Sequence, residues 1–498
     1  MMRKLSLFWT MMALLVMRGN LWAASTGPEL KFEPESQSSE SQKAGTPYGE
    51  KPLLKFGSDR SYFRLGGYGS IRFSTDTAQD INDTFTFRRL VLTTDAMIAS
   101  KFRIYTEIEF ERFRKVEFES NVIAQDGGIT VSQEIEGVNH SELSLEQAWF
   151  DLEFKPYIHL QGGAVLVPVG RFNINHDDNL WNLPRRSLVD RGVPVLPVEA
   201  AWDELGFGLN GDVDLGEKAR MNYRIYVVNG VTLNPQLEQA AHTRFPDHDE
   251  LELEAEFGIN TGTFSQDVKS AKAVTGRVAF SPALGHEIGL SGYWGRYTPS
   301  FLPGKNLTMF GFDWLSSFGN FDIEAEYILS HYGGMNQVLT AFAAQAGNTT
   351  GEFETGDSTN LETEIAMKPS GLADTKQGYW VEMRYHIRPD WLTKSWFGRN
   401  FSDPQFIPIV RWEQAFISGL VTEFEADNNV VTKLTKQNRR VDRITAGMAF
   451  RLNPIAVFHM AYEYTQTNKG QSLASVTNYL PTPSSSNHSF MFGAAFGF

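Results

Sequence analysis

The last nine residues of the chain, Phe490-Met-Phe-Gly-Ala-Ala-Phe-Gly-Phe498, alternate between two kinds of side chain. Successive side chains of a β-strand point to opposite faces, so Phe490, Phe492, Ala494, Phe496 and Phe498 share one face. The intervening residues are Met, Ala and Gly. One aromatic face and one face of small residues is the pattern expected of a barrel strand, with lipid outside and a lumen inside. Chain termini of soluble proteins are usually loose and solvated, so this ending favours a membrane β-barrel.

The N-terminal end predicts export. Arg3 and Lys4 precede an apolar run at residues 5–17, and Ala23 offers a small residue for cleavage, so residues 1–23 are expected to be a signal peptide. Residues 24–55 are rich in Ser, Glu, Gln, Pro and Gly, and we expect a flexible N-terminal arm in the periplasm. Residues 56–498 would form the barrel. No later segment approaches 20 consecutive apolar residues, which excludes helical membrane spans.

Composition narrows the function classes. The 498-residue chain has no cysteine, which excludes a disulfide scaffold and thiol chemistry. The net charge of −14 argues against a nucleic-acid partner. The mean hydropathy is −0.29 although 13% of residues are aromatic, as expected when only alternate residues face lipid.

Turns and loops alternate along the chain. Short turns are predicted at residues 99–101, 155–157, 216–218, 282–285, 318–320 and 453–454. Longer polar stretches lie at residues 114–140, 170–202, 231–270, 333–375, 419–439 and 467–486. This rhythm predicts an all-β, antiparallel transmembrane barrel of about 16 strands with short periplasmic turns and long extracellular loops. The turn at residues 389–404 is longer than expected for the periplasmic side, where it is predicted to lie. An even strand count puts both termini in the periplasm.

Several short motifs resemble one porin family. They are Phe87-Arg-Arg-Leu90, Leu145-Glu-Gln-Ala-Trp-Phe-Asp151, Gly163-Ala-Val-Leu-Val-Pro-Val-Gly170, Tyr379-Trp-Val-Glu-Met-Arg-Tyr385 and Val410-Arg-Trp-Glu413. Together they resemble the phosphate-selective porin O and P family of bacterial outer-membrane porins, and the terminal Phe498 is similar to the C-terminal signature of outer-membrane proteins. The resemblance implies a sixteen-stranded homotrimer with the third loop folded into the pore. It also implies phosphate selectivity in some members, which are described as having an arginine ladder and a lysine cluster; the lysine cluster has no evident counterpart here.

Alternation also assigns the lumen lining, because an Arg or Lys facing lipid at mid-bilayer costs roughly 2–4 kcal/mol. The residues predicted to face the lumen are Arg64, Arg72, Arg89, Arg103, Glu107, Glu109, Glu382, Arg384, Arg411, Glu413 and Arg443. Arginine is therefore the main cation of the predicted pore, and its planar fork suits carboxylate or phosphate. Alternatively, these arginines pair with lumen acids and stiffen the wall.

The stretch at residues 170–202 is the best candidate for a pore constriction, since long loops of this kind are usually functional. Its candidate selectivity residues are Arg171, Asp177, Asp178, Arg185, Arg186 and Arg191. Arg185, Arg186 and Arg191 could form a cationic ring at the narrowest point. They could equally latch the loop to Asp177, Asp178 and wall glutamates.

Other chemistries find less support in this loop. His176-Asp177-Asp178 has metal-ligating residue types, but no further ligand can be named, so no metal site is predicted. His176, Ser187 and Asp190 have the residue types of a hydrolase triad, but the chain has no G-x-S-x-G elbow. We therefore expect no enzyme and no cofactor.

The sequence thus predicts an outer-membrane porin for passive diffusion of small hydrophilic solutes, with anions such as phosphate as one substrate class. The expected partners are outer-membrane lipid, the solutes themselves and two further copies of the chain. The alternative is a weakly selective channel for sugars and other polar solutes, since Tyr68, Tyr105 and Trp380 could stack on sugar rings. A barrel enzyme is the third class.

Overall fold

A computed structural model describes residues 54–58, 60–77, 83–111, 116–125, 128–137, 142–190, 195–198, 201–244, 249–262, 267–346, 361–367, 371–401, 403–468 and 485–498. All of them belong to one compact unit, Thr46–Phe498. The predicted signal peptide and most of the predicted arm lie outside the described residues. Among the helices that the structure describes, none has the length and apolar character needed to span a bilayer.

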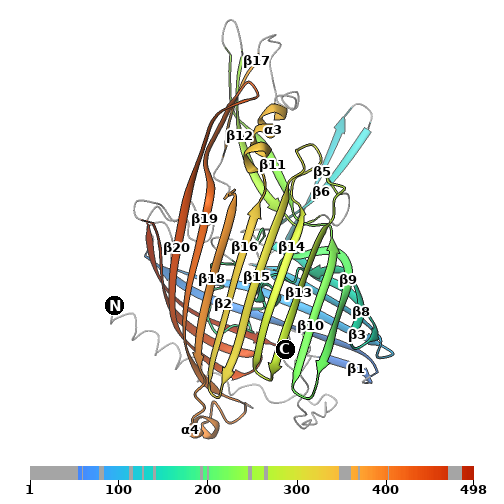
Figure 1. Ribbon diagram of the computed structural model, residues 1–498, viewed down its shortest axis with the longest axis vertical. Coiled ribbons are helices and arrows are strands. Elements are labelled where there is room, and N and C mark those ends of the chain that lie inside the picture. The colour runs from blue at the N-terminus through green and yellow to red at the C-terminus, as the bar shows by residue number, and fades with distance from the viewer. Residues whose placement is uncertain are drawn as a thin grey trace. The chain divides into compact units, whose positions relative to one another are not determined.

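Sixteen antiparallel strands form a closed barrel (Figure 1). In chain order they are β2 (Ser61–Asp76), β3 (Thr84–Ile98), β4 (Phe102–Glu111), β7 (Glu142–Lys155), β8 (Ile158–Leu166), β9 (Asp203–Leu215), β10 (Ala219–Val228), β13 (Ala273–Ala283), β14 (His286–Arg296), β15 (Asn306–Phe318), β16 (Phe321–Tyr332), β18 (Thr375–Tyr385), β19 (Gln405–Asp427), β20 (Val430–Asn453), β21 (Ala456–Thr467) and β22 (Ser486–Gly497). Each pairs with the next, and β22 pairs with β2. Closure leaves no free edge, and the predicted strand number is confirmed.

The C-terminal strand forms the closing seam. Its register with β2 runs from Tyr68 opposite Gly497 to Asp76 opposite Ser489. Beyond the strand, the Phe498 amide donates to the Gly67 carbonyl (2.9 Å), and the Gly67 amide donates to the Phe498 carbonyl (3.1 Å). Phe498 therefore completes the ring of strands by pairing with Gly67 of β2.

Exposure alternates along the strands as predicted. In β4, Ile104 and Ile108 are exposed, whereas Tyr105, Glu107 and Glu109 between and beside them are buried. In β22, Phe490 and Phe496 are exposed and Met491 and Ala495 are buried. The barrel thus turns an apolar surface outward and a largely polar one inward.

Short and long connections lie at opposite ends of the barrel. Turns join β3–β4, β7–β8, β9–β10, β13–β14, β15–β16 and β20–β21 at the predicted places. The irregular turn between β18 and β19 carries the short helix α4 (Asp390–Lys394), at the short-turn end in Figure 1. The long-connection end carries β5 (Val116–Gln125), β6 (Gly128–Gly137), β11 (Thr232–Arg244), β12 (Asp249–Asn260), β17 (Leu361–Met367) and α3 (Met335–Ala346). At the chain start, β1 (Leu54–Ser58) forms a hairpin with β2.

Among the described residues, five of the six predicted loops contain a helix or strand, and three of them add strands to the barrel sheet. Residues 419–439 are mostly strand, because β19 and β20 extend past the barrel and turn at Asn428 and Asn429, both with positive φ. Most of residues 231–270 forms the β11–β12 hairpin, and β17 joins β12 to the β19 extension. The acidic residues of β12 concealed an alternating apolar face, because Leu251, Leu253, Ala255 and Phe257 are all buried.

Candidate functional site

Residues 170–202, here called the inner loop, connect β8 to β9 and fold into the barrel. Gly170 opens the loop with φ +82°, and a Cβ there would lie 2.8 Å from Ile328 Cδ1 of β16. The helical turn α2 (Arg171–Ile174) follows. At the base, the Trp202 amide donates to Asn173 Oδ1 (2.8 Å). Most described side chains of the loop are buried, so it packs against the wall instead of projecting from the barrel.

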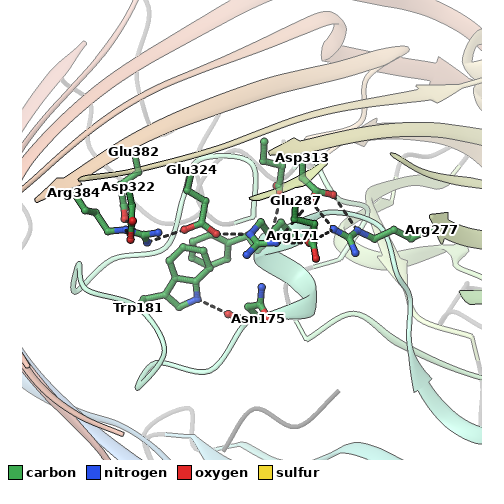
Figure 2. A network of polar contacts seen from close by, with 12 residues as sticks. Arg171, Asn175, Trp181, Arg277, Glu287, Asp313, Asp322, Glu324, Glu382 and Arg384 are labelled. Atoms are coloured by element: carbon green, nitrogen blue, oxygen red, sulfur yellow. Dashed lines mark hydrogen bonds and ion pairs between the residues drawn. The ribbon is translucent and has the colours of Figure 1, made fainter. Parts of the chain in front are cut away.

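Arg171 joins the inner loop to the wall through carboxylates that it shares with wall arginines (Figure 2). It donates to Glu287 Oε1 (2.8 Å) and to Glu324. Arg277 donates to the same oxygen of Glu287 (2.9 Å), and Arg384 lies 2.7 Å from Glu324 Oε2. Each of the two carboxylates thus lies between two guanidinium groups.

This network continues around the wall as an alternating charge belt. Its contacts are Arg384–Glu382 (3.2 Å), Arg411–Glu382 (3.7 Å), Arg411–Glu413 (3.3 Å), Arg443–Glu413 (3.9 Å), Arg443–Glu463 (3.4 Å) and Arg185–Glu463 (2.5 Å). Asp313, which Arg277 contacts at 2.6 Å, belongs to the same belt at its other end. Every arginine of the belt therefore has at least one carboxylate within 4 Å, which compensates buried charge.

Arg185 and Arg186 lie inside this packing. Both are 4% exposed. Arg185 contacts Glu463, and its carbonyl accepts a bond from Arg411 (2.6 Å). Arg186 donates to the His176 carbonyl (2.6 Å). These contacts are the ones expected if the two arginines hold the inner loop in place, the role called a latch here. Arg191, the third member of the predicted cationic ring, lies outside the described residues.

Asp178 binds the opposite wall. Its Oδ2 accepts hydrogen bonds from Ser70 Oγ (2.6 Å) and from Arg88 Nε (3.1 Å). Burial alone would raise the pKa of Asp178, but Arg88, Arg89 and Arg186 outweigh it and hold that pKa well below its usual range. The carboxylate is therefore ionised at neutral pH, and it fastens the loop to β2 and β3.

His176 and Asp177 form the third contact between the inner loop and the wall, where the loop meets β4 and β7. His176 Nε2 lies 3.5 Å from Glu146 Oε2 and 3.6 Å from Asp177 Oδ1. Burial would lower the pKa of His176, but Asp177 and Glu146 outweigh it and raise the pKa to about 10. Burial raises the pKa of Asp177 to about 6, although His176 opposes the shift. Glu107 completes this buried cluster, with ligand-type atoms of Glu107, Glu146 and His176 within 4.8 Å of one another.

Two wall residues that contact the inner loop do not follow strict alternation. Arg88 and Glu146 each sit at a β-bulge, where the register between neighbouring strands shifts by one residue. Consequently Arg88 and Arg89 are both buried, as are Glu146 and Gln147, and both bulges contact the inner loop. Bulges often re-aim side chains at functional sites. The available signal was two adjacent polar residues in a membrane-spanning strand, since one of them would otherwise face lipid.

The remaining predicted lumen residues lie elsewhere on the inner surface. Arg72 donates to the Pro184 carbonyl of the inner loop (3.3 Å). Nearer the short-turn end, Arg103 donates to Asp95 (2.8 Å), and Arg64 lies 4.1 Å from the centroid of the Tyr62 ring. Arg72 thus helps to hold the inner loop, whereas Arg103 and Arg64 contact side chains of the wall itself.

Comparison with known proteins supplies no family assignment. No family model matches the chain. An uncharacterised protein of Aquifex aeolicus is 28% identical over 168 residues, which are 34% of this chain and 32% of that protein. The chain thus aligns with about a third of that relative's length.

Solved structures that are similar to the chain include outer-membrane porins. They include OmpF of Salmonella typhi in complex with daunomycin (10% identity, TM-score 0.48, 89% of this chain and 100% of that one). An anion-selective porin from Comamonas acidovorans has 9% identity and a TM-score of 0.47, covering 88% and 100%. The channel DcaP of Acinetobacter baumannii has 8% identity and a TM-score of 0.44, covering 90% and 100%. Identities and TM-scores this low assign no family and no solute, so the fold rests on the chain's own strand pairing.

Proposed function

We propose that the protein is an outer-membrane porin through which small hydrophilic solutes diffuse passively. The observation that carries this proposal is the closed sixteen-stranded barrel with an apolar exterior and a charged interior. In β14, for example, Leu290 is 50% exposed whereas neighbouring Ser291 is 6% exposed. An apolar exterior of this kind is stable in the hydrocarbon core of a bilayer but not in water.

Aromatic residues at both ends of the strands support the same orientation in a membrane. Phe154 and Phe318 are exposed near the short turns, and Phe85 and Trp294 are exposed near the long connections. Aromatic girdles of this kind mark the two interfaces of an outer-membrane barrel. With the predicted signal peptide, they favour the outer membrane of a Gram-negative-type bacterium, with the short turns and the arm in the periplasm.

For selectivity we propose a weak preference between ions, and diffusion of neutral solutes as well. The support is the charge belt, in which carboxylates accompany each arginine. A compensated ring presents a smaller net field to a passing ion than a bare cationic ring would. Phosphate selectivity of the kind found in the resembling family would require cationic side chains facing solvent at the constriction.

Assembly into a homotrimer is part of the proposal and rests on the sequence resemblance. Outer-membrane lipid and the diffusing solutes are the other partners. A barrel enzyme would instead require a reactive constellation, whereas Ser187 and Asp190 of the inner loop are both fully buried.

A liposome-swelling assay tests this proposal. Refolded protein in liposomes should admit neutral sugars and anionic or cationic solutes of matched size at similar rates, with rates falling as size increases. Swelling with none of these solutes would contradict the porin assignment. Swelling with anions alone would support the porin assignment but would contradict the proposed weak selectivity and show anion selectivity instead.

A further inference from the structure

The inner loop and two wall strands bring together a buried group of metal-ligating side chains. His176 and Asp177 come from the loop, Glu107 from β4 and Glu146 from the bulge in β7. We propose that His176, Glu146 and Glu107 bind one divalent transition-metal ion, with Zn²⁺ as the representative, and that Asp177 lies beside the ion next to His176.

The observation that points to a ligand is a set of buried polar atoms without hydrogen bonds. Among the described residues, these atoms include His176 Nε2, Glu146 Oε2 and both carboxylate oxygens of Asp177. His176 is 1% exposed and Asp177 is fully buried. Buried polar groups in native proteins almost always have partners, so the atoms of His176 and Glu146, which lie 3.5 Å apart without a hydrogen bond, call for a cation.

The spacing of these atoms fits a metal centre. Zn²⁺ binds nitrogen and carboxylate oxygen at about 2.0–2.2 Å, so tetrahedral ligand atoms stand roughly 3.4 Å apart. His176 Nε2 lies 3.5 Å from Glu146 Oε2 and 3.6 Å from Asp177 Oδ1. These separations are too long for good hydrogen bonds but suit two ligands of one ion.

The groups behind these side chains orient them as a metal site requires. His176 Nδ1 is 3.0 Å from the Asn173 carbonyl, which fixes Nδ1 as a donor, so Nε2 is the nitrogen that would exchange its proton for a metal ion. Glu107 Oε2 accepts hydrogen bonds from Gln147 (2.5 Å) and from Tyr105 (3.2 Å). Metal-ligating histidines and carboxylates characteristically have such outer partners.

The charge balance leads to the same conclusion. Glu107, Glu146 and Asp177 offer three carboxylates, and the nearby guanidinium groups of Arg89 and Arg186 already contact Glu109 (2.7 Å) and Asp190 (3.6 Å). Without a metal, a proton on His176 would have to supply the compensating charge. An imidazole with several carboxylates suits first-row ions such as Zn²⁺, whereas Ca²⁺ and Mg²⁺ prefer oxygen ligands alone.

A bound ion would connect the inner loop to β4 and β7, the part of the wall opposite Glu287 and Glu324 of the belt. It would thus fix the loop on a second side. This site does not depend on the proposed porin function, because it is defined by ligands and not by transport.

Cobalt titration tests the site directly. The full chain, refolded in detergent without lipopolysaccharide and freed of metal with a chelator, is titrated with Co²⁺ while the visible absorption of the bound ion is recorded. We expect one Co²⁺ per chain, displaced by Zn²⁺ and not by a similar concentration of Ca²⁺. Absence of binding up to about 1 mM Co²⁺, or preferential displacement by Ca²⁺, would overturn the proposal.

Variants identify the ligands. His176→Ala and Glu146→Gln should each weaken Co²⁺ binding at least tenfold. His159→Ala removes a lumen histidine that contacts Asp151 (2.7 Å) and lies outside the inner loop, and this control variant should bind Co²⁺ as the wild type does. Equal loss in the control variant, or none in the ligand variants, would contradict the assignment. If a variant fails to fold, X-ray absorption of the Zn²⁺-loaded wild type decides, since a first shell without imidazole would refute the site.

Discussion

The latch contact between Arg185 and Glu463 makes a quantitative prediction. Their side chains are 4% and 1% exposed and lie 2.5 Å apart. Removing one partner of a buried ion pair typically costs about 3–5 kcal/mol, because the other charge is left uncompensated. Arg443 remains 3.4 Å from Glu463 and offsets part of that loss. We therefore expect Arg185→Met to lower the free energy of unfolding by about 3 kcal/mol.

Denaturant unfolding of the refolded barrel measures this loss, with tryptophan fluorescence as the signal, because Trp181 and Trp202 lie in the inner loop. A double-mutant cycle with Glu463→Gln isolates the pairwise energy, which should be at least about 1.5 kcal/mol. The control is Arg220→Met, because Arg220 contacts Asp214 at 2.9 Å in an exposed pair. Such a pair should contribute less than about 1 kcal/mol.

The latch interpretation is wrong if Arg185→Met lowers the free energy of unfolding by no more than the control variant Arg220→Met does. A small stability loss together with a large shift of reversal potential toward cations would instead assign Arg185 to ion selectivity. The same variant thus separates the two roles that the sequence left open for this arginine.

Three further predictions concern the loop entrance, its pH dependence and the barrel seam. Gly170→Ala places a Cβ against the wall at positive φ and should lower the free energy of unfolding by about 2–3 kcal/mol. Gly216→Ala is the control, because the turn there leaves open space, and it should lower the free energy of unfolding by about 1 kcal/mol. Chemical unfolding compares the two variants. The pKa of Asp178 is lower in the folded chain than its unfolded value near 3.9, so its stabilisation should be constant above about pH 5 and should decline as the pH falls below about 4. Unfolding free energies of wild type and Asp178→Asn should therefore converge in acid, and a difference independent of pH down to 3 would disprove the linkage. Deleting Phe498 removes two main-chain hydrogen bonds with Gly67 and should lower the folded fraction in heat-modifiability gels, whereas Phe498→Tyr keeps both bonds and should fold normally.

The barrel could be predicted from the sequence because the membrane imposes a simple rule. Lipid outside and polar groups inside enforce a period of two, so the strand count and the turn positions could be predicted from the sequence. The same rule does not account for Arg88 and Glu146, because a bulge shifts the period by one residue and depends on the neighbouring strand.

The site was harder to predict, because its partners are distant in the sequence. Loop composition identified His176 and Asp177, but nothing in the sequence indicated that Glu146 would meet them. Likewise, the sequence could not decide between a latch and a selectivity ring for Arg185, since Glu463 lies 278 residues away. The topology of the chain determines such contacts, and the topology cannot be deduced from the local periodicity of the sequence.

Single-channel recording in planar bilayers, with a tenfold KCl gradient, tests the central claim most directly. We predict steady conductance steps and a reversal potential far below the roughly 59 mV of ideal selectivity for a monovalent ion. The compensated charge belt around the inner loop is the reason for this expectation. A reversal potential near that limit would contradict the weak selectivity, and a correctly folded barrel without conductance would contradict the porin itself.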